Sequence, residues 1–563
     1  MAWARAALVL LPAGAIGLLL VSGGSSADPR TPAALPGMPP PFLGTALVGN
    51  GRLTAAIDAY GDVVDMRAPG PAGRGLIDNP SDRQAARTVA VGTGIVPRVK
   101  IEDGPALPMW RADSVSQRYL PGTNVVRTVA RFGRVRISIT DAAVGGAFAR
   151  RVQSSAPAGV RVEPVAEVNV QAGARCERNQ RVRETDLLCS SGEADSPIDS
   201  SGDSVDQSSV GAQTDMTLRS AAVSDREWLD NARPLGRAAP RWAREMYRRS
   251  LLTLRALTDR RTGAVAAGAR DGWAYVWPRD AATAALAFAA AGYRSEAEHI
   301  ARFLLGVDLD AGARYQGDGN PVAVRAAQGD AAGWVAVASD TVGLTWSRRQ
   351  ASRALHHVDR FPWRGRADYQ EADPGDYLAN AIASTSVDEP KTPLYEGKWA
   401  HLHASSAIAA EFGAARGLVR TARDPGSGLD TAAAWAVRPF PLPALYPEVR
   451  RTMLRLAGQQ TRFGITPGEG WTGGVDPWTA PTAWTAWSLA ALADRDRLGR
   501  PAVALGERRQ ALRLLGDLRR AATPAGALPE RVDARTGAPR STTPLAWSHA
   551  FAILALRQLW PQQ

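Results

Sequence analysis

The hydrophobic period of the chain changes near Pro240, and this change constrains the fold more than any other feature. Before it, apolar and polar residues alternate in short runs, as in Val135–Ile139. After it, apolar residues recur at helical spacing, first in Trp242–Leu254. Alternation favours half-buried strands, whereas a period of about 3.6 residues favours amphipathic helices. The chain of 563 residues is also long for one domain, so we predict a β domain followed by an α domain.

The first domain is predicted to be an antiparallel β-sandwich over residues 28–224. The turn Gly49–Gly51 lies between the apolar runs 47–48 and 53–56, which is typical of a β-hairpin. Residues 190–208 are rich in Ser, Asp and Gly and are expected to form a loop. The remaining β pattern extends to about residue 222, with strands expected near 63–66, 135–139 and 160–165.

The second domain is predicted to be a barrel of paired helices over residues 240–563, after a linker over 225–239. Strand signals are nearly absent there, and the helices are too numerous for a four-helix bundle. Beyond the first helix, the pattern predicts helices over 280–291, 294–305, 333–346, 403–420, 446–458, 477–492, 504–520 and 545–559.

The N-terminal segment has the layout of an export signal. In residues 1–27, Arg5 precedes an apolar run, which ends in small residues. The run contains Pro12 and is short for a membrane-spanning helix. Both a cleaved signal peptide and an N-terminal membrane anchor fit this pattern. We therefore expect a protein that is secreted or held at the outer face of the cell membrane.

The chain contains two cysteines, Cys176 and Cys189. In an exported protein, an even pair this close in sequence predicts a disulfide. No histidine lies near either thiol, and two thiolates cannot complete a structural zinc site. We expect no metal elsewhere, since the histidines do not have metal-ligand spacing.

The formal net charge of +12 does not indicate a nucleic-acid partner. The arginines are scattered, without a dense basic run or a nucleic-acid-binding motif. A phosphate loop, a dinucleotide fingerprint and a Ser-His-Asp signature are also lacking. We therefore expect no cofactor.

The segment Asp271–Asp280 concentrates residues that could bind a sugar. Three aromatic residues, an arginine and an aspartate directly precede a helix of small residues. Aromatic faces stack on sugar rings, and charged side chains form directed hydrogen bonds to hydroxyl groups. The same residues could instead be core aromatics with Asp280 as a helix cap.

Four segments together carry a family resemblance. Trp273–Asp280 resembles the first barrel motif of the glucoamylase-type glycoside hydrolases, family 15. Gln328–Trp334 resembles the family's Gln/Asp/Gly segment beside the sugar, and Gly473–Trp484 resembles its Gly-Gly-x-Pro-Trp helix start. Leu528–Asp533 resembles its last motif, together with Pro544–His549.

This resemblance extends over about residues 40–563 and implies an N-terminal β-sandwich followed by an (α/α)6 barrel. It implies an exo-acting, inverting hydrolase of α-linked glucosides in oligosaccharides or polysaccharides. Glu530 would be the general base and Glu396 the general acid, with the two carboxyl groups roughly 6.5–9.5 Å apart. We expect the sugar to contact Trp273, Tyr275, Trp277, Arg279, Asp280, Gln328, Asp330, Tyr395, Trp478 and Trp547.

The chain also departs from the family pattern. Gly397 follows the expected acid where the family often has glutamate, and the arginine expected before the Gly-Gly segment is missing from 463–471. Glu469 is a reserve candidate for the acid. Trehalase or glucodextranase specificity, a phosphorolytic enzyme and a catalytically silent glycan-binding protein therefore remain alternatives to a monomeric glucoamylase-type hydrolase.

Overall fold

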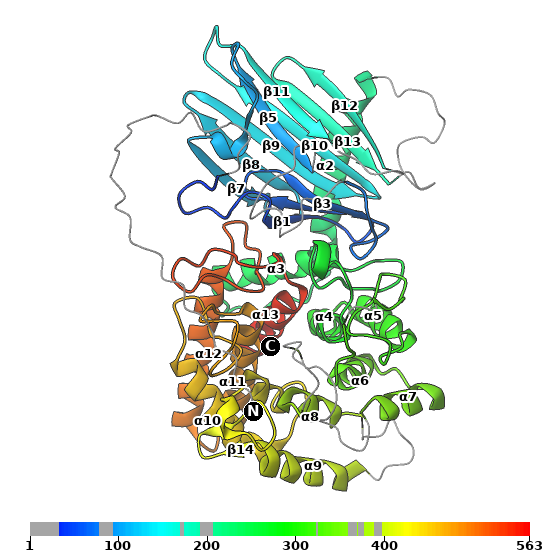
Figure 1. Ribbon diagram of the computed structural model, residues 1–563, viewed down its shortest axis with the longest axis vertical. Coiled ribbons are helices and arrows are strands. Elements are labelled where there is room, and N and C mark those ends of the chain that lie inside the picture. The colour runs from blue at the N-terminus through cyan, green and yellow to red at the C-terminus, as the bar shows by residue number, and fades with distance from the viewer. Residues whose placement is uncertain are drawn as a thin grey trace, which may run out of the picture.

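The computed structural model describes a β region stacked on a helical region (Figure 1). The structure describes residues 33–77, 94–168, 174–191, 207–322, 325–358, 369, 376–387 and 397–562. The expected export segment 1–27 and the expected site residues Tyr395 and Glu396 lie outside these ranges. Within the described residues, no helix has both the length and the apolarity that crossing a bilayer requires.

Two antiparallel sheets form the N-terminal region. One sheet has the order β1-β2-β3-β5-β11, and in it β4 also pairs with β3 and β6 also pairs with β5. The other sheet has the order β12-β13-β10-β9-β8-β7. The strands are β1 (Gly44–Gly49), β2 (Thr54–Asp58), β3 (Val63–Ala68), β4 (Arg74–Gly75), β5 (Ile95–Ile101), β6 (Leu107–Pro108), β7 (Ser114–Tyr119), β8 (Val126–Phe132), β9 (Val135–Val144), β10 (Ala147–Ser155), β11 (Val162–Val168), β12 (Arg175–Arg181) and β13 (Glu184–Ser190). The hairpin predicted at Gly49–Gly51 is β1–β2, with Gly49 paired to Thr54.

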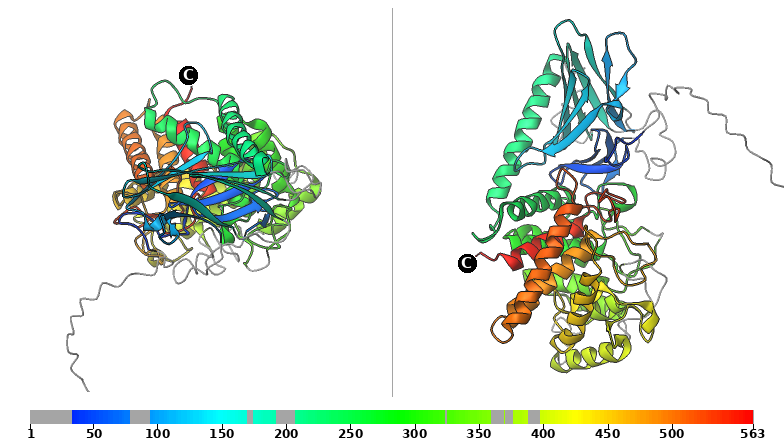
Figure 2. Two further views of the ribbon diagram at one scale, coloured as in Figure 1. Left: turned by 90° about the horizontal axis from the view of Figure 1, so that it is seen from above. Right: turned by 90° about the vertical axis from the view of Figure 1, so that its left-hand side faces the viewer.

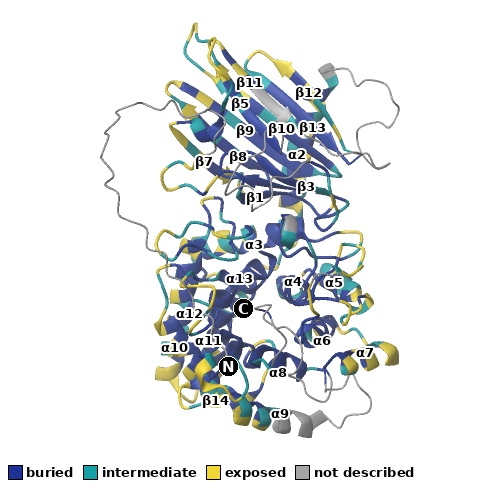
Figure 3. Ribbon diagram, in the orientation of Figure 1, coloured by how far each residue is buried: buried dark blue, intermediate teal, exposed yellow. Residues whose placement is uncertain are grey.

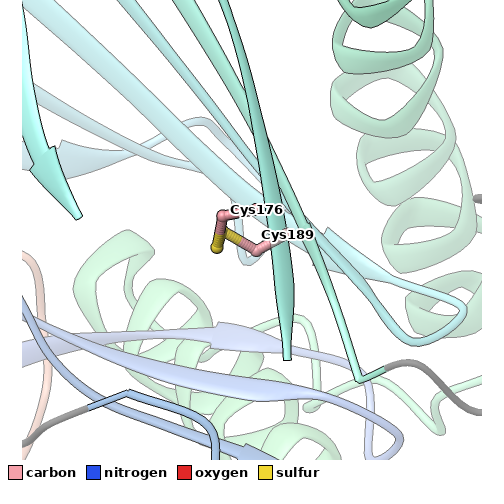
Figure 4. Close-up of a disulfide and its surroundings, with 2 residues drawn as sticks. All are labelled: Cys176 and Cys189. Carbon is pink, nitrogen blue, oxygen red and sulfur yellow. A yellow bond between two sulfur atoms is a disulfide. The ribbon is translucent and has the colours of Figure 1, made fainter. Parts of the chain in front are cut away.

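The predicted disulfide is confirmed and joins neighbouring strands of the second sheet (Figure 4). Cys176 on β12 and Cys189 on β13 are directly paired in the antiparallel register, and their Cα atoms lie 4.1 Å apart. The bond therefore reinforces an existing strand pair.

A long helix, α2 (Gln207–Asp230), occupies a range where the sequence pattern indicated β structure and then a linker. It packs against β9, β10, β12 and β13, and Figure 2 shows it running along the sheet. Val210 and Ala221 bury themselves against sheet residues, but the helix is otherwise largely polar. The β expectation up to residue 222 was wrong because so few apolar residues reveal the helical period.

The helices after α2 are α3 (Arg241–Leu257), α4 (Pro278–Ala291), α5 (Arg294–Gly306), α6 (Ala331–Val342), α7 (Arg348–Val358), α8 (Leu378–Ser384), α9 (Gly397–Phe412), α10 (Tyr446–Gly458), α11 (Thr479–Asp496), α12 (Pro501–Ala521) and α13 (Ala546–Leu559). Between α9 and α10 lies a 3-10 helix, Thr431–Ala436. The strand pair in this region, β14 (Gly413–Ala414) with β15 (Gly417–Leu418), is short and antiparallel.

The helices form two concentric rings. Contacts run from α4 to α6, α8, the 3-10 helix Thr431–Ala436, α11 and α13, and α13 closes the ring against α4. These inner elements are buried almost throughout, whereas outer helices such as α5 and α10 bury one face only (Figure 3). Their alternation along the chain is the arrangement of an (α/α) barrel.

Some predicted helix bounds were wrong. The helix expected over 403–420 ends at Phe412, where the chain turns into β14 and β15. The helix expected over 333–346 ends at Val342, because Gly343 adopts a left-handed conformation that caps it. The helices α7 and α8 and the 3-10 helix Thr431–Ala436 were not predicted.

The two regions contact each other closely beside β1. The guanidinium group of Arg270 donates a hydrogen bond to the carbonyl oxygen of Phe42. A Cβ atom at Gly44 would lie 3.3 Å from the carbonyl oxygen of Thr543, so this strand lies against the backbone of the barrel. At Gly51, with φ 85°, any side chain would overlap another barrel carbonyl. Glycine is therefore required there.

Candidate active site

A cavity of about 310 Å³ lies where several inner helices begin. Most of its lining comes from the first turns of α4 and α13 and from the segments that precede α4, α11 and α13. The lining residues are Ala267, Gly272, Trp273, Trp277, Arg279, Asp280, Arg325, Tyr369, Trp478, Glu530, Arg531, Ser541, Leu545 and Trp547.

The start of α4 explains why two charged residues face this cavity. Trp277 is extended and Pro278 is the first helical residue, which places Arg279 and Asp280 in the first turn. Both side chains are almost fully buried by the inner ring. The geometry therefore fixes a cation and an acid at one site.

Arg279 is held by groups on three sides. Its Nη1 donates to Asp330 Oδ2 at 3.0 Å and to Gln328 Oε1 at 3.2 Å. Its guanidinium carbon lies 4.5 Å from the centroid of the Trp547 ring. Asp330 therefore compensates the charge of Arg279 and fixes its orientation.

Asp280 is placed where it can change protonation near neutral pH. Burial raises its pKa to about 7, with Arg279 opposing the shift and Glu530 adding to it. Its Oδ2 lies 3.6 Å from Arg279 Nη2. Below this pKa the protonated Asp280 can donate a hydrogen bond to a ligand, and above it the carboxylate can accept one.

Both carboxylate oxygens of Glu530 accept hydrogen bonds at the cavity. Trp273 Nε1 donates to Oε1 at 3.3 Å, and the hydroxyl of Ser541 donates to Oε2. Burial raises the pKa of Glu530, while these two hydrogen bonds and the charges of Arg531 and Arg325 act in the opposite direction. The carboxylate is oriented but remains beside open space.

Backbone hydrogen bonds hold the Glu530 segment in position. The Glu530 N–H donates to the Thr542 carbonyl at 2.9 Å, and its own carbonyl accepts from the Thr479 N–H at 3.1 Å. Behind it, His549 Nε2 accepts from the Leu528 N–H at 3.0 Å. Burial lowers the pKa of His549 to about 3, so the ring is a neutral acceptor. His549 therefore supports the segment and does not line the cavity.

The predicted site residues fall into three groups. Trp273, Trp277, Arg279, Asp280, Trp478, Glu530 and Trp547 line the cavity together. Gln328 and Asp330 lie behind Arg279, and Tyr275 packs under the guanidinium group of Arg314, 4.7 Å from its ring centroid. Glu396 and Tyr395 lie outside the described residues.

The reserve candidate Glu469 does not line this cavity. It forms ion pairs with Arg455 at 2.9 Å and with Arg416 at 3.4 Å. Although partial burial acts to raise the pKa of Glu469, hydrogen bonds from Arg455 and Gln459 hold it below its ordinary value. A carboxyl group stabilised as an anion is poorly suited to be a general acid.

Several lining residues were not predicted: Arg325, Tyr369, Arg531 and Ser541. Arg531 directly follows Glu530 within the last motif, so its position could have been noticed. Ser541 also lies close to that motif in sequence. Arg325 and Tyr369 belong to segments without a recognisable pattern, and only the closed ring brings them to Glu530.

The comparisons with known proteins match one segment of the chain to a family model and most of the chain to a solved structure. The model of the glycosyl hydrolases family 15 matches residues 241–311, which include the motif Trp273–Asp280. A crystal structure of a bacterial glucoamylase complexed with acarbose matches with a TM-score of 0.66 and 13% identity, covering 96% of this chain and 96% of that one. A search of curated proteins finds no match.

Two further solved structures match a little over half of this chain. A glycosidase matches with a TM-score of 0.47 and 21% identity, covering 56% of this chain and 97% of that one. A glucoamylase from Saccharomycopsis fibuligera matches with a TM-score of 0.45 and 15% identity, covering 56% and 94%.

The fold class defined by these findings is an antiparallel β-sandwich followed by an (α/α)6 barrel, as in the bacterial glucoamylase. The predicted resemblance to glycosyl hydrolases family 15 is confirmed over residues 241–311 by the family model.

Proposed function

We propose that the protein is an exported, inverting, exo-acting hydrolase of α-linked glucosides. Glu530 is the general base, and Glu396 is the general acid. The observation that carries this proposal is the position of Glu530, whose hydrogen-bonded carboxylate borders an aromatic-lined cavity with Arg279 and Asp280. The fold shared with a glucoamylase that was solved with acarbose supports the substrate class.

The surroundings of Glu530 suit a base that activates water. Trp273 and Ser541 fix both carboxylate oxygens and leave their remaining lone pairs for a water molecule. Burial raises the pKa of Glu530, which makes the carboxylate a stronger base than an exposed glutamate. An inverting reaction needs a carboxylate of this kind on one face of the sugar.

Other residues of the lining supply contacts for the sugar. Trp277 and Trp547 offer aromatic surface, while Asp280 can form hydrogen bonds to sugar hydroxyl groups. Arg279 adds a charged donor whose direction is fixed by Asp330. Together these groups would orient the glycosidic bond toward Glu530.

The role of Glu396 rests on the family resemblance. This residue directly precedes α9, the first described element after the gap at 388–396. In an inverting enzyme it would protonate the leaving oxygen from the face opposite Glu530. Glu396→Gln should slow natural substrates far more than activated aryl glucosides, whose leaving groups depart without protonation. Equal slowing of both would exclude Glu396 as the acid.

The deciding experiment is an assay on maltose, maltotriose, isomaltose and trehalose with the purified protein. With maltotriose, NMR of the glucose first released from the non-reducing end should show the β-anomer, because inversion at an α-linkage gives β. Release of this glucose as the α-anomer would exclude the inverting mechanism. A requirement for inorganic phosphate, with glucose 1-phosphate as product, would indicate the phosphorolytic alternative.

A catalytically silent glycan-binding protein remains the second candidate, because the arginine expected in 463–471 is missing. Calorimetric binding of these sugars without turnover by wild-type protein would favour it. Cell fractionation would test export, and sedimentation would test whether the protein is a monomer.

A further inference from the structure

One buried histidine outside the cavity contacts a residue that holds Arg279. His357 lies in the last turn of α7, and its side chain is almost fully buried. Its Nε2 lies 2.8 Å from the carbonyl oxygen of Gln328, and its Nδ1 lies 3.0 Å from Oδ1 of Asp310. The side chain of Gln328 accepts a hydrogen bond from Arg279, so His357 is linked to Arg279 through one residue.

Both partners of the His357 ring are hydrogen-bond acceptors. A backbone carbonyl oxygen can only accept, and so can an ionised carboxylate. A neutral imidazole has one N–H, so its other nitrogen would face an acceptor without a proton between them. The doubly protonated ring donates to both groups and completes two hydrogen bonds. The contacts therefore favour the imidazolium form of His357.

The charged groups around His357 also bear on this form. Asp310 supplies a counter-charge in direct contact with the ring, and Asp308 accepts the Asp310 N–H at 3.2 Å. The C-terminal end of α7 also favours a cation. Burial of the ring acts against its charge, as does Arg353, which lies one turn earlier on α7. Because Asp310 is the group in hydrogen-bond contact, we expect its contribution to be the largest.

The segment that His357 contacts carries two partners of Arg279. Gln328 and Asp330 accept from Arg279 Nη1 at 3.2 and 3.0 Å, and Arg279 lines the cavity. We propose that His357 is a positioning residue for sugar binding, and that its doubly protonated ring fixes Gln328 and thereby the direction of Arg279. The inference rests on the proposed function, in which Arg279 contacts the substrate.

Loss of one ring proton should loosen Gln328. A hydrogen bond to a carboxylate is stronger than one to a carbonyl, so the neutral ring should keep its proton on Nδ1, toward Asp310. The bond from Nε2 to the Gln328 carbonyl is then the one that is lost. Sugar binding should consequently weaken as pH rises and His357 becomes neutral.

One substitution separates this role from simple packing. In Asp310→Asn, the side-chain amide can donate to Nδ1 of a neutral ring, which then keeps its Nε2–H for Gln328. This variant therefore needs no charge on His357. His357→Gln has all its side-chain donors on one nitrogen and can form only one of the two bonds. His356→Gln, at the exposed neighbour on α7, is the matched control.

Calorimetry with maltotriose, on proteins that also carry Glu530→Gln, measures binding from about pH 5 to 8 without turnover. At the alkaline end, we expect the parent and His356→Gln to bind about threefold to tenfold more weakly than Asp310→Asn, because one hydrogen bond is lost. At the acidic end, His357→Gln should bind more weakly than the parent by a similar factor. Asp280 also titrates in this range, but it is present in all four proteins and cancels in the comparison.

NMR of protein with labelled histidine tests the protonation directly. The His357 signals are identified by their absence in His357→Gln. Where the parent binds tightly, they should show two ring N–H groups, whereas Asp310→Asn should stay tight with one. Should His357→Gln fail to fold, Asp310→Asn still provides both measurements.

Parallel affinity profiles for the parent, Asp310→Asn and His357→Gln would overturn the inference, and so would a single ring N–H in the tightly binding parent. Cleavage of maltotriose by the wild type together with parallel profiles would contradict the role of His357 alone. The expected binding pattern without cleavage of any sugar would support that role and contradict the proposed hydrolase activity.

Discussion

The sandwich and the barrel both bury carboxyl groups, but among the described residues compared here only Glu530, in the barrel, borders a cavity. In the sandwich, Asp141 is fully buried and binds Arg150 at 2.7 Å. Asp58 accepts backbone hydrogen bonds from Phe42 and Tyr60 at 2.7 and 2.8 Å. In the barrel, Glu530 borders a cavity of about 310 Å³.

Burial raises the pKa of the carboxyl group in all three cases. A raised pKa therefore does not distinguish a structural acid from a catalytic one. What distinguishes Glu530 is the adjacent space, which in the proposed function holds the sugar and the attacking water. Substitutions in the two regions should consequently affect different measurements.

The largest expected effect is on Glu530. Glu530→Gln should reduce kcat/KM by up to about 10⁴-fold, because an amide cannot accept the proton of the attacking water. Its melting temperature should stay near that of the wild type, since an amide oxygen can still accept one of the hydrogen bonds. Stopped assays and thermal melts of both proteins measure the two effects, and substantial residual activity would exclude the base role.

In contrast to Glu530→Gln, Asp141→Asn should lower stability and leave activity unchanged. It leaves the buried Arg150 without its counter-charge, which should destabilise the sandwich by about 3 kcal/mol or more. Activity per folded molecule should stay unchanged, because the pair lies in the other domain. Urea denaturation followed by tryptophan fluorescence measures the loss of stability, and an active-site titration gives the activity per folded molecule. A fall in that activity would show that the two regions are coupled.

Removing the disulfide should have a slightly smaller effect on the same domain. The double change Cys176→Ser and Cys189→Ser should lower stability by about 3 kcal/mol in the chain-entropy model for a loop of this length. Since β12 and β13 remain paired along their length, the fold should persist. Denaturation of the reduced wild-type protein is the matched control, and it should agree with the variant.

The smallest expected effect is a shift of the pH profile by Ser541→Ala. The Ser541 hydroxyl opposes the rise in the pKa of Glu530, so its loss should raise that pKa further. A base works only when ionised, and kcat/KM is lost as pH falls through its pKa. The acidic limb should therefore move to higher pH. An unchanged limb would mean that another group controls it.

Sequence alone predicted the elements whose patterns are local. The hairpin at Gly49–Gly51 follows from turn chemistry, and α10 follows from one apolar face. The 3-10 helix Thr431–Ala436 escaped prediction because it is buried on every side and has no polar face to mark a period. A short element that is enclosed on every side is thus hard to recognise, although this one completes the inner ring between α8 and α11.

The residues of the site also divide into those that a local motif reveals and those that only the fold brings together. Trp273–Asp280 and Glu530 belong to continuous motifs, so they could be named from sequence. Arg325 and Tyr369 reach the cavity only through closure of the inner ring, which no local pattern encodes. Ser541 and Arg531 lay near or within a motif, but their roles depend on the direction of their side chains toward Glu530.

The contact of Arg270 with the Phe42 carbonyl has a consequence for modularity. Arg270 lies three positions before Trp273, and Thr543, which packs on Gly44, lies two positions after Ser541. Both hydrogen-bond donors to Glu530 are thus placed by segments that rest on β1. The sandwich is therefore part of the scaffold of the site, and the barrel cannot be exchanged between proteins as an independent cassette without losing that support.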